Sequence, residues 1–280
     1  MRVAHEVTGL HAAPSQMQFK YIDVDAFRVH WHQHPEWELT YILSGSGYRM
    51  VGGSIEVFFA GDAVLLGGNL PHTWVSEPHP DGSQAIVLHL TSNLIREFAQ
   101  IPGAERFQGL ASQAGQGLCF DSRGSELSDR MRAGLGAQGL AMHAAAAHVF
   151  DLLERLPVRA LSAPSPPRVL HLATQNALER TAQRFRDPEF NLTELAAWVG
   201  MEKSPFCTQF KRATGRTFSQ HLHQLRTANA ARELATTSKS VRHIAFHSGY
   251  DSIPYFNRMF RAIYGVTPGE FRQKISAHSG

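Results

Sequence analysis

The chain has little cysteine and no long apolar run. Of its 280 residues only Cys119 and Cys207 are cysteines; they stand far apart and form no CxxC pattern. This argues against a disulfide framework and indicates a reducing compartment. No stretch approaches the ~18 consecutive apolar residues of a membrane-spanning helix, and no apolar signal region follows Met1. We therefore expect a soluble, cytoplasmic protein.

Charge is unevenly distributed along the chain. From Arg168 onward there are 16 Lys and Arg against 8 Asp and Glu, a net of +8, whereas the first 167 residues hold 11 against 16, a net of −5. Together they give the formal charge of +3. A basic C-terminal half is the footprint that a polyanion binder needs, and the acidic half is where DNA should not bind.

The first third of the chain is typical of β-structure. Short β-rich runs alternate with glycine-rich turns such as Ser44–Gly47 and Gly52–Gly53. Six or more strands at roughly ten-residue spacing predict a sandwich or barrel. The predicted strands are Phe27–His30, Leu39–Leu43, Tyr48–Val51, Ile55–Phe59, Ala63–Leu66 and Ala85–Leu88.

From Asn93 the pattern becomes helical. Ser125–Leu156, rich in Ala, Leu and Met, is interpreted either as a cover for the barrel or as a dimer seam. Ala163–Pro167 is a proline-stiffened linker. The predicted fold class is therefore multidomain α+β. Its segments are a barrel over residues 1–95, a helical cover or dimerisation segment over 96–162, a linker over 163–168 and an all-α domain over 169–275.

The all-α domain contains one pattern twice. Each copy is a short helix, a glycine turn and a second helix that ends in Phe-Lys or Phe-Arg. Ala196 and Gly200 match Ala245 and Gly249 at an offset of 49, and Phe210, Gly215 and Thr217 match Phe260, Gly265 and Thr267 at an offset of 50. Two helix-turn-helix units in tandem place two second helices where each can enter a major groove of DNA.

Helix boundaries in this domain follow from capping residues. We expect Asn191, Thr217, Ser240 and Ser252 to begin helices, and Ser204 with Pro205 to begin the second helix of the first unit. A long helix from Thr217 to Leu234 would hold the two units at a fixed separation. Phe256 and Phe260 share one face of their helix, which favours a core role for both.

The opposite faces of the two second helices carry the predicted DNA contacts. Arg258 can reach guanine O6 and N7, and Asn257 can reach adenine N6 and N7, although an ordinary solvated surface residue is the alternative for each. The predicted base-reading residues are Ser204, Cys207, Thr208, Ile253, Pro254, Asn257 and Arg258. Because its side chains are short, the first unit should read less sequence. Predicted phosphate contacts are Lys203, Lys211, Arg212, Ser252 and Arg261.

The segment Leu192–Arg272 closely resembles the DNA-binding domain of the AraC/XylS family of bacterial transcription regulators. The resemblance rests on Ile244-Ala245, Gly249-Tyr250, Tyr255-Phe256-x-x-x-Phe260-Arg261 and Gly265-x-Thr267-Pro268-x-x-Phe271-Arg272. Glu202 stands where members often have serine. The resemblance implies a double-stranded DNA operator and RNA polymerase as partners, and a barrel that senses a small effector, often a sugar.

A second resemblance lies in the N-terminal half. His32-x-His34-x₃-Glu38-x₆-Gly45 is similar to the first cupin motif, and Gly61-Asp62 with Pro71-His72 is similar to a degraded second one. In cupin barrels the matching side chains converge inside the barrel. The resemblance implies His32, His34, Glu38 and His72 as ligands of a divalent transition metal, with Zn, Ni, Fe or Mn all compatible.

Three interpretations of this site stay open: a metal-free polar pocket, a metal-assisted effector pocket and a catalytic cupin. The predicted effector pocket contains His32, His34, Glu38, His72, Trp37 and Tyr41. Trp31 and Trp74 are further flat rings that could stack on a sugar. We expect a ligand-responsive, dimeric transcription activator and not an enzyme. A metal-responsive regulator, and less favourably a cupin enzyme fused to a DNA-binding domain, are the alternatives.

Overall fold

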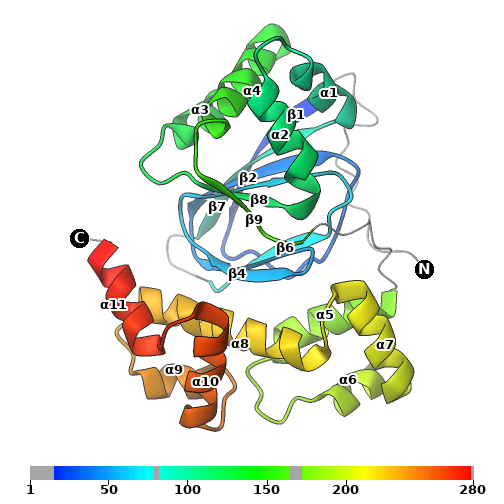
Figure 1. The fold of residues 1–280 in the computed structure, drawn as a ribbon, viewed down its shortest axis with the longest axis vertical. Coiled ribbons are helices and arrows are strands. Elements are labelled where there is room, and N and C mark those ends of the chain that lie inside the picture. The colour runs from blue at the N-terminus through cyan, green and yellow to red at the C-terminus, as the bar shows by residue number, and fades with distance from the viewer. Residues whose placement is uncertain (1–15, 79–81, 164–171, 279–280) are drawn as a thin grey trace.

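The computed structural model describes residues 16–78, 82–163 and 172–278 of the chain. An antiparallel β-sandwich closed into a cupin-like barrel forms the N-terminal half, and helices alone form the C-terminal half (Figure 1). The predicted fold class, a barrel with a helical layer followed by two helix-turn-helix units joined by a long helix, is confirmed. In the described part of the chain, none of the helices has the length and apolarity needed to cross a bilayer.

Two antiparallel sheets build the barrel. The larger has the strand order β1-β7-β2-β5-β8-β9, and the smaller has the order β4-β3-β6. Their bounds are β1 Met17–Val24, β2 Trp37–Ser44, β3 Gly47–Val51, β4 Ser54–Phe58, β5 Asp62–Leu66, β6 His72–Ser76, β7 Ser83–Leu90, β8 Leu118–Asp121 and β9 Val158–Ala160.

The outer face of the larger sheet carries a helical layer. Leu39 of β2, Leu65 of β5 and Leu88 of β7 are buried there against helices, because alternate residues of a strand point to opposite faces. The same alternation turns Glu38 and Thr40 toward the barrel interior. The layer consists of α1 Ser92–Ala99, α2 Glu105–Gln113, a 3₁₀ turn Ala114–Gln116, α3 Leu127–Ala133 and α4 Gly139–Leu153 (Figure 1).

Two predictions in this half are wrong. The segment 96–162 is not purely helical, because β8 pairs with β5 and β9 pairs with β8, extending the larger sheet. Phe27–His30 is not a strand either. This stretch passes along the barrel without ladder pairing until His32 exchanges two backbone hydrogen bonds with His72, at 3.2 and 2.9 Å, in an isolated bridge.

The C-terminal half contains seven helices among the described residues. They are α5 Leu172–Arg184, α6 Leu192–Trp198, α7 Lys203–Thr214, α8 Phe218–Thr236, α9 Val241–His247, α10 Ile253–Tyr264 and α11 Pro268–His278. The two helix-turn-helix units, α6–α7 and α9–α10, lie at opposite ends of α8 (Figure 1). The predicted linker beyond residue 163 and the first residues of the predicted all-α domain, 169–171, lie outside the described residues.

Most predicted caps are confirmed. The Asn191 side chain accepts hydrogen bonds from the backbone N–H groups of Thr193 and Glu194, and Thr217 forms a capping box with Gln220. Ser240 caps α9 through its hydroxyl. Ser252 occupies the N-cap of α10 but makes no side-chain capping bond.

The predicted start of α7 is wrong. Its N-cap is Glu202, and Ser204 and Pro205 lie within the first turn. Glu202 provides no side-chain capping bond. The helix begins earlier because the chain leaves the left-handed Gly200 turn, at φ +72°, and is already extended at Glu202. Lys203 therefore occupies the first helical position.

The two halves of the chain pack closely on each other. Helix α8 lies against β3 and β4 (Figure 1). Tyr48, Met50 and Ile55 of the small sheet belong to one apolar cluster with residues of the first helix-turn-helix unit. Val57 of β4 packs against the clusters of both units. An ion pair joins Arg186 to Glu77 at 2.5 Å across the same boundary. The helical half is thus held against the barrel through β3, β4 and α8.

Candidate metal centre and nucleic-acid interface

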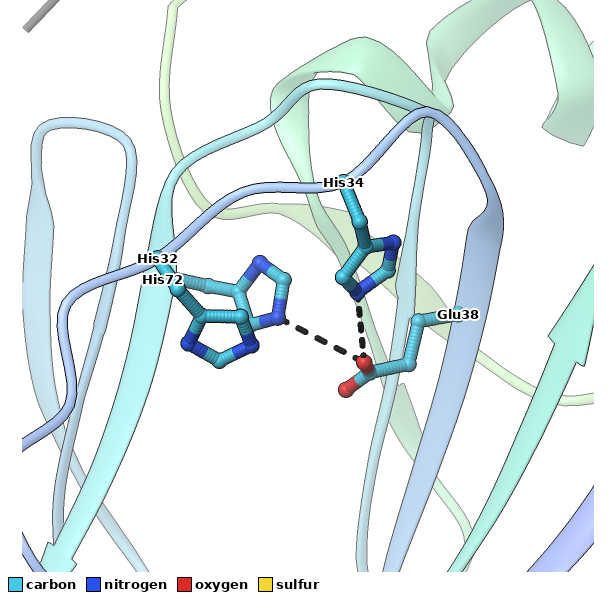
Figure 2. A group of neighbouring side chains, drawn as sticks. All are labelled: His32, His34, Glu38 and His72. Atoms are coloured by element: carbon cyan, nitrogen blue, oxygen red, sulfur yellow. Dashed lines mark hydrogen bonds and ion pairs between the residues drawn. The ribbon is translucent and has the colours of Figure 1, made fainter. Parts of the chain in front are cut away.

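The four predicted metal ligands converge inside the barrel. His32 and His34 lie on the segment before β2, Glu38 lies on β2 and His72 begins β6. One nitrogen or oxygen atom from each lies within 4.8 Å of the others (Figure 2). Glu38 Oε2 is 3.1 Å from His34 Nε2 and 3.4 Å from His72 Nε2. His34, Glu38 and His72 are buried, and His32 is partly exposed.

Backbone carbonyl groups fix the protonation pattern of the three imidazoles. The Nδ1 atoms of His32, His34 and His72 face the carbonyl oxygens of His30, Glu36 and Leu70 at 2.7, 3.1 and 2.8 Å. Because a carbonyl oxygen only accepts, each Nδ1 carries the hydrogen, and in each neutral ring Nε2 keeps its lone pair. Backbone contacts that orient imidazole ligands in this way are typical of metal sites.

Electrostatics favour the forms that bind a cation. Burial alone raises the pKa of the Glu38 carboxyl, but the neighbouring imidazoles of His72, His34 and His89 hold it well below its ordinary value. Burial lowers the pKa of His72, in spite of the nearby Glu38 carboxylate. The site therefore combines a carboxylate with a neutral imidazole, the protonation states that metal ligands need.

His89 is a member of the cluster that the sequence motif did not include. It lies on β7 directly opposite Glu38 of β2, and its Nε2 is 3.0 Å from Glu38 Oε2. Its Nδ1 is buried and has no hydrogen-bond partner among the described residues. Thr40 donates a hydrogen bond to the other Glu38 oxygen. A histidine between Leu88 and Leu90, just after the apolar run Ala85–Leu88, was the available signal. His89 and Thr40 therefore orient the Glu38 carboxylate.

The residues present fit a divalent transition metal. Three imidazole nitrogens with lone pairs and one carboxylate oxygen face a common point, a set that suits Zn, Ni, Fe or Mn. Without a cation, the Nε2 lone pair of His34 would face the Glu38 carboxylate at 3.1 Å. Either a metal ion or an extra proton relieves that repulsion.

Two predicted pocket residues do not reach this cluster. Trp37 and Tyr41 lie on β2 at odd positions, so they point away from Glu38 and into the core under the helical layer. The Tyr41 hydroxyl forms a hydrogen bond with Ser128 of α3, on the far side of the sheet. By contrast, the centre of the Trp74 ring lies 5.7 Å from the centre of the His72 ring inside the barrel. The prediction that Trp37 and Tyr41 line the pocket is wrong because of strand alternation.

The exposed face of α7 in the first unit carries short side chains. Ser204, Thr208 and the basic residues that follow are exposed, while Phe206 and Phe210 are fully buried on the opposite face. Cys207 is partly buried. The exposed basic residues that flank this surface are Lys203, Lys211 and Arg212.

The second unit presents longer side chains on α10. Pro254, Asn257, Arg258 and Arg261 are exposed, and Ile253 is partly buried against the core of the unit. Phe256 and Phe260 are fully buried, which confirms their predicted core role.

The Arg258 guanidinium is oriented by a neighbour. It lies 4.9 Å from the centre of the Tyr255 ring, and the Tyr255 hydroxyl is 2.8 Å from His223 Nε2 on α8. Arg258 is therefore held at the exposed face of α10 instead of moving freely in solvent.

Family comparisons agree with this division of the chain. A helix-turn-helix domain family matches residues 195–274, and a cupin domain family matches residues 21–80. The first match begins within α6 and ends within α11, and the second contains all four candidate ligands.

The related proteins are transcription regulators. The MmsAB operon regulatory protein of Pseudomonas aeruginosa is 34% identical over 32% of this chain and 29% of its own length. The transcriptional activator RhaR of Mannheimia succiniciproducens is 35% identical over 31% and 32%. The chain thus spans about a third of these two relatives.

A shorter relative is matched over most of its length. The regulatory protein SoxS of Salmonella typhimurium is 32% identical over 32% of this chain and 83% of its own. Among solved structures, the C-terminal domain of AraT from Geobacillus stearothermophilus is 25% identical over 38% of this chain and 87% of that domain, with a TM-score of 0.37. With its tandem helix-turn-helix units behind a cupin domain, the chain belongs to the AraC/XylS family of DNA-binding transcription regulators.

Proposed function

We propose that this regulator is an effector-responsive transcription activator whose barrel holds a divalent transition metal at His32, His34, Glu38 and His72. The observation that carries the metal is the convergence of three imidazole Nε2 atoms, each with its hydrogen placed on Nδ1 by a carbonyl, around one carboxylate oxygen. A bare polar pocket would have no need of so many lone pairs at one point.

The metal would act as part of the sensor. Its ligands come from the segment before β2, from β2 and from the start of β6, so binding would hold the two sheets together at one end of the barrel. Metal content would then change the stiffness of the wall on which an effector acts. The relatives are transcription regulators, and their identity favours a metal-assisted regulator over a catalytic cupin.

On the DNA side, α7 and α10 would enter successive major grooves. Asn257 and Arg258 are the main readers, with Ser204, Cys207, Thr208, Ile253 and Pro254 at the same faces. Lys203, Lys211, Arg212, Ser252 and Arg261 would contact phosphates. Two such chains on paired half-sites, recruiting RNA polymerase in the cytoplasm, complete the proposed arrangement. An effector would act by shifting the population between presentations of the two units.

The expected sugar effector has weaker support than the metal. It depended on rings that could stack on a sugar face, and two of these, Trp37 and Tyr41, lie outside the barrel interior. We retain a small molecule as effector and argue its chemical class separately below.

Elemental analysis of the untagged full-length protein tests the metal. We expect about one transition-metal ion per chain, with a fall in melting temperature after chelation, because the ion binds the folded state. His34→Ala combined with His72→Ala should abolish metal binding, whereas His143→Ala, a change to an exposed histidine of α4, should not. The proposal would be contradicted by protein that contains no metal and whose melting temperature changes neither with chelator nor with added Zn²⁺.

A further inference from the structure

A pocket of about 470 Å³ lies between the barrel and the first helix-turn-helix unit. Its walls come from the β3–β4 turn, the loop before β6, the residues after β9 and the turn between α7 and α8. Pockets of 300–1,000 Å³ hold drug-sized ligands. None of the four candidate metal ligands lines it, although Trp31 and Pro71, their chain neighbours, do.

Arg216 gives this pocket a positive charge without a carboxylate partner. It follows the C-cap Gly215 of α7 and is partly buried. Its guanidinium reaches across to the barrel, where its Nη2 is 3.6 Å from the point at which a Cβ would stand on Gly53. Burial lowers the pKa of Arg216, with no acidic group of the described chain acting on it. A second arginine at the domain boundary, Arg186, is paired with Glu77.

Two further polar groups in the wall lack partners. Trp31 and His221 are each 4% exposed, and Trp31 Nε1 and His221 Nε2 form no hydrogen bond with any described residue. A buried polar group without a partner costs about 1–3 kcal/mol, so such groups are rare unless a ligand or water satisfies them. An indole N–H and a guanidinium are donors only, so they call for an acceptor.

The rest of the wall is largely apolar. Its larger side chains are Met50, Ile55, Leu70, Leu161 and Leu178. An occupant that satisfies both parts would have one anionic end with oxygen acceptors and an uncharged body. A sugar, with hydroxyl groups on all sides, would leave polar groups against this apolar wall.

We propose that this pocket binds a small organic monocarboxylate, with its carboxylate on Arg216 and its apolar body between Leu70 and Leu178. The inference rests on the proposed function in that the ligand is the effector. Arg216 directly follows the helix that carries the base-reading residues of the first unit, so a ligand bridging Arg216 to Gly53 ties that helix to the barrel. The loop before β6 connects the same wall to His72.

Isothermal titration of the metal-loaded full-length protein with octanoate and benzoate tests the proposal, with 1-octanol and glucose as uncharged probes. We expect saturable binding of a carboxylate and at least tenfold weaker binding of 1-octanol and glucose. Arg216→Gln should weaken carboxylate binding at least tenfold, and Arg216→Lys should recover part of it. Arg96→Gln, at an exposed arginine of α1, is the matched control and should bind as the unmodified protein does.

A second variant tests the location independently of charge. Gly53→Leu should fill the pocket, and because Gly53 does not need a positive φ, the β3–β4 turn should tolerate it. Circular dichroism melting checks that each variant is folded. The site is refuted if no carboxylate binds, if 1-octanol or glucose binds as well, or if both Arg216→Gln and Gly53→Leu bind normally. Metal content and DNA binding, measured on the same samples, report separately on the proposed function.

Discussion

His89 of β7 and Glu38 of β2 are paired on adjacent strands of the larger sheet, and His89 Nε2 lies 3.0 Å from Glu38 Oε2. His89 supplies the hydrogen that the three candidate metal-ligating imidazoles cannot give, since their hydrogens lie on Nδ1. The same Glu38 oxygen thus accepts a hydrogen bond from His89 and faces the Nε2 atoms of His34 and His72.

Replacing His89 should weaken metal binding without removing a ligand. Because groups that orient a ligand typically contribute 10–100-fold to metal affinity, His89→Ala should lower the affinity for Zn²⁺ by about that factor. A chelator competition assay measures it. His148→Ala, at an exposed position of α4, serves as control. Unchanged affinity in His89→Ala would mean that Glu38 needs no support from β7.

Arg258 should carry sequence discrimination. A bidentate contact to guanine is worth about 1–3 kcal/mol, so Arg258→Ala should cost that much on the preferred operator and relax the preference at one base position. Selection from randomised DNA followed by anisotropy titration measures both effects. Tyr255→Phe keeps the ring under the guanidinium and should preserve specificity. If Arg258→Ala keeps the base preference of the unmodified protein, Arg258 does not read a base.

Lys211 should act on all sequences alike. A phosphate contact releases about one counterion, so Lys211→Ala should weaken specific and random DNA equally and reduce the slope of log affinity against log salt by about one. The measurement is a salt titration of binding, with Lys20→Ala on β1 as the control. A loss restricted to the preferred operator would reassign Lys211 to base reading.

Gly249 should tolerate substitution less well than Gly200. Both are left-handed, with φ +84° and +72°. A Cβ on Gly249 would stand 2.5 Å from the carbonyl oxygen of Phe185 and 2.9 Å from Arg226 Nε, whereas a Cβ on Gly200 would have no atom of the described residues within 4 Å. Gly200→Ala should therefore cost about 1–2 kcal/mol from backbone strain alone, and Gly249→Ala clearly more. Denaturant midpoints of the two variants give the comparison; equal losses would contradict the close approach.

Glu233 should make the DNA-binding half sensitive to acid. Burial by itself raises the pKa of Glu233, but hydrogen bonds from His247 and Lys239 lower it overall. Because the pKa of Glu233 is lower in the folded state than in the unfolded chain, its ionised form stabilises the folded state at pH values above the unfolded pKa of about 4.3. This contribution is lost as the pH falls through the folded-state pKa. Glu233→Gln should flatten the fall in melting temperature below that pH, and Glu97→Gln on α1 should not. Parallel melting curves for Glu233→Gln and the unmodified protein would exclude this role.

The repeated helical pattern was predictable because its signals are local. Caps such as Asn191 and Thr217 and turns such as Gly200 act within a few residues. The misplaced start of α7 shows the limit of that argument: Ser204 and Pro205 suit a helix start, but the preceding turn had already set the helix at Lys203.

The barrel was harder to predict because its pairings are remote in sequence. The strands β8 and β9 are short; β8 pairs with β5, more than fifty residues earlier, and β9 can pair only once β8 is in place. The motif located His32, His34, Glu38 and His72 correctly, yet gave no access to His89, which only the β2–β7 register brings to Glu38. The same register shows why Trp37 and Tyr41 face outward.

The contact of the small sheet with α8 also bears on how this chain can be divided. Tyr48, Met50 and Ile55 are buried in the cluster that they share with the helical half. Cutting the chain at the linker would turn them into a contiguous apolar patch on the severed barrel, the kind of surface that drives aggregation. A sensor fragment should therefore be poorly soluble, and a chimera that grafts this barrel onto another regulator must carry a matching α8.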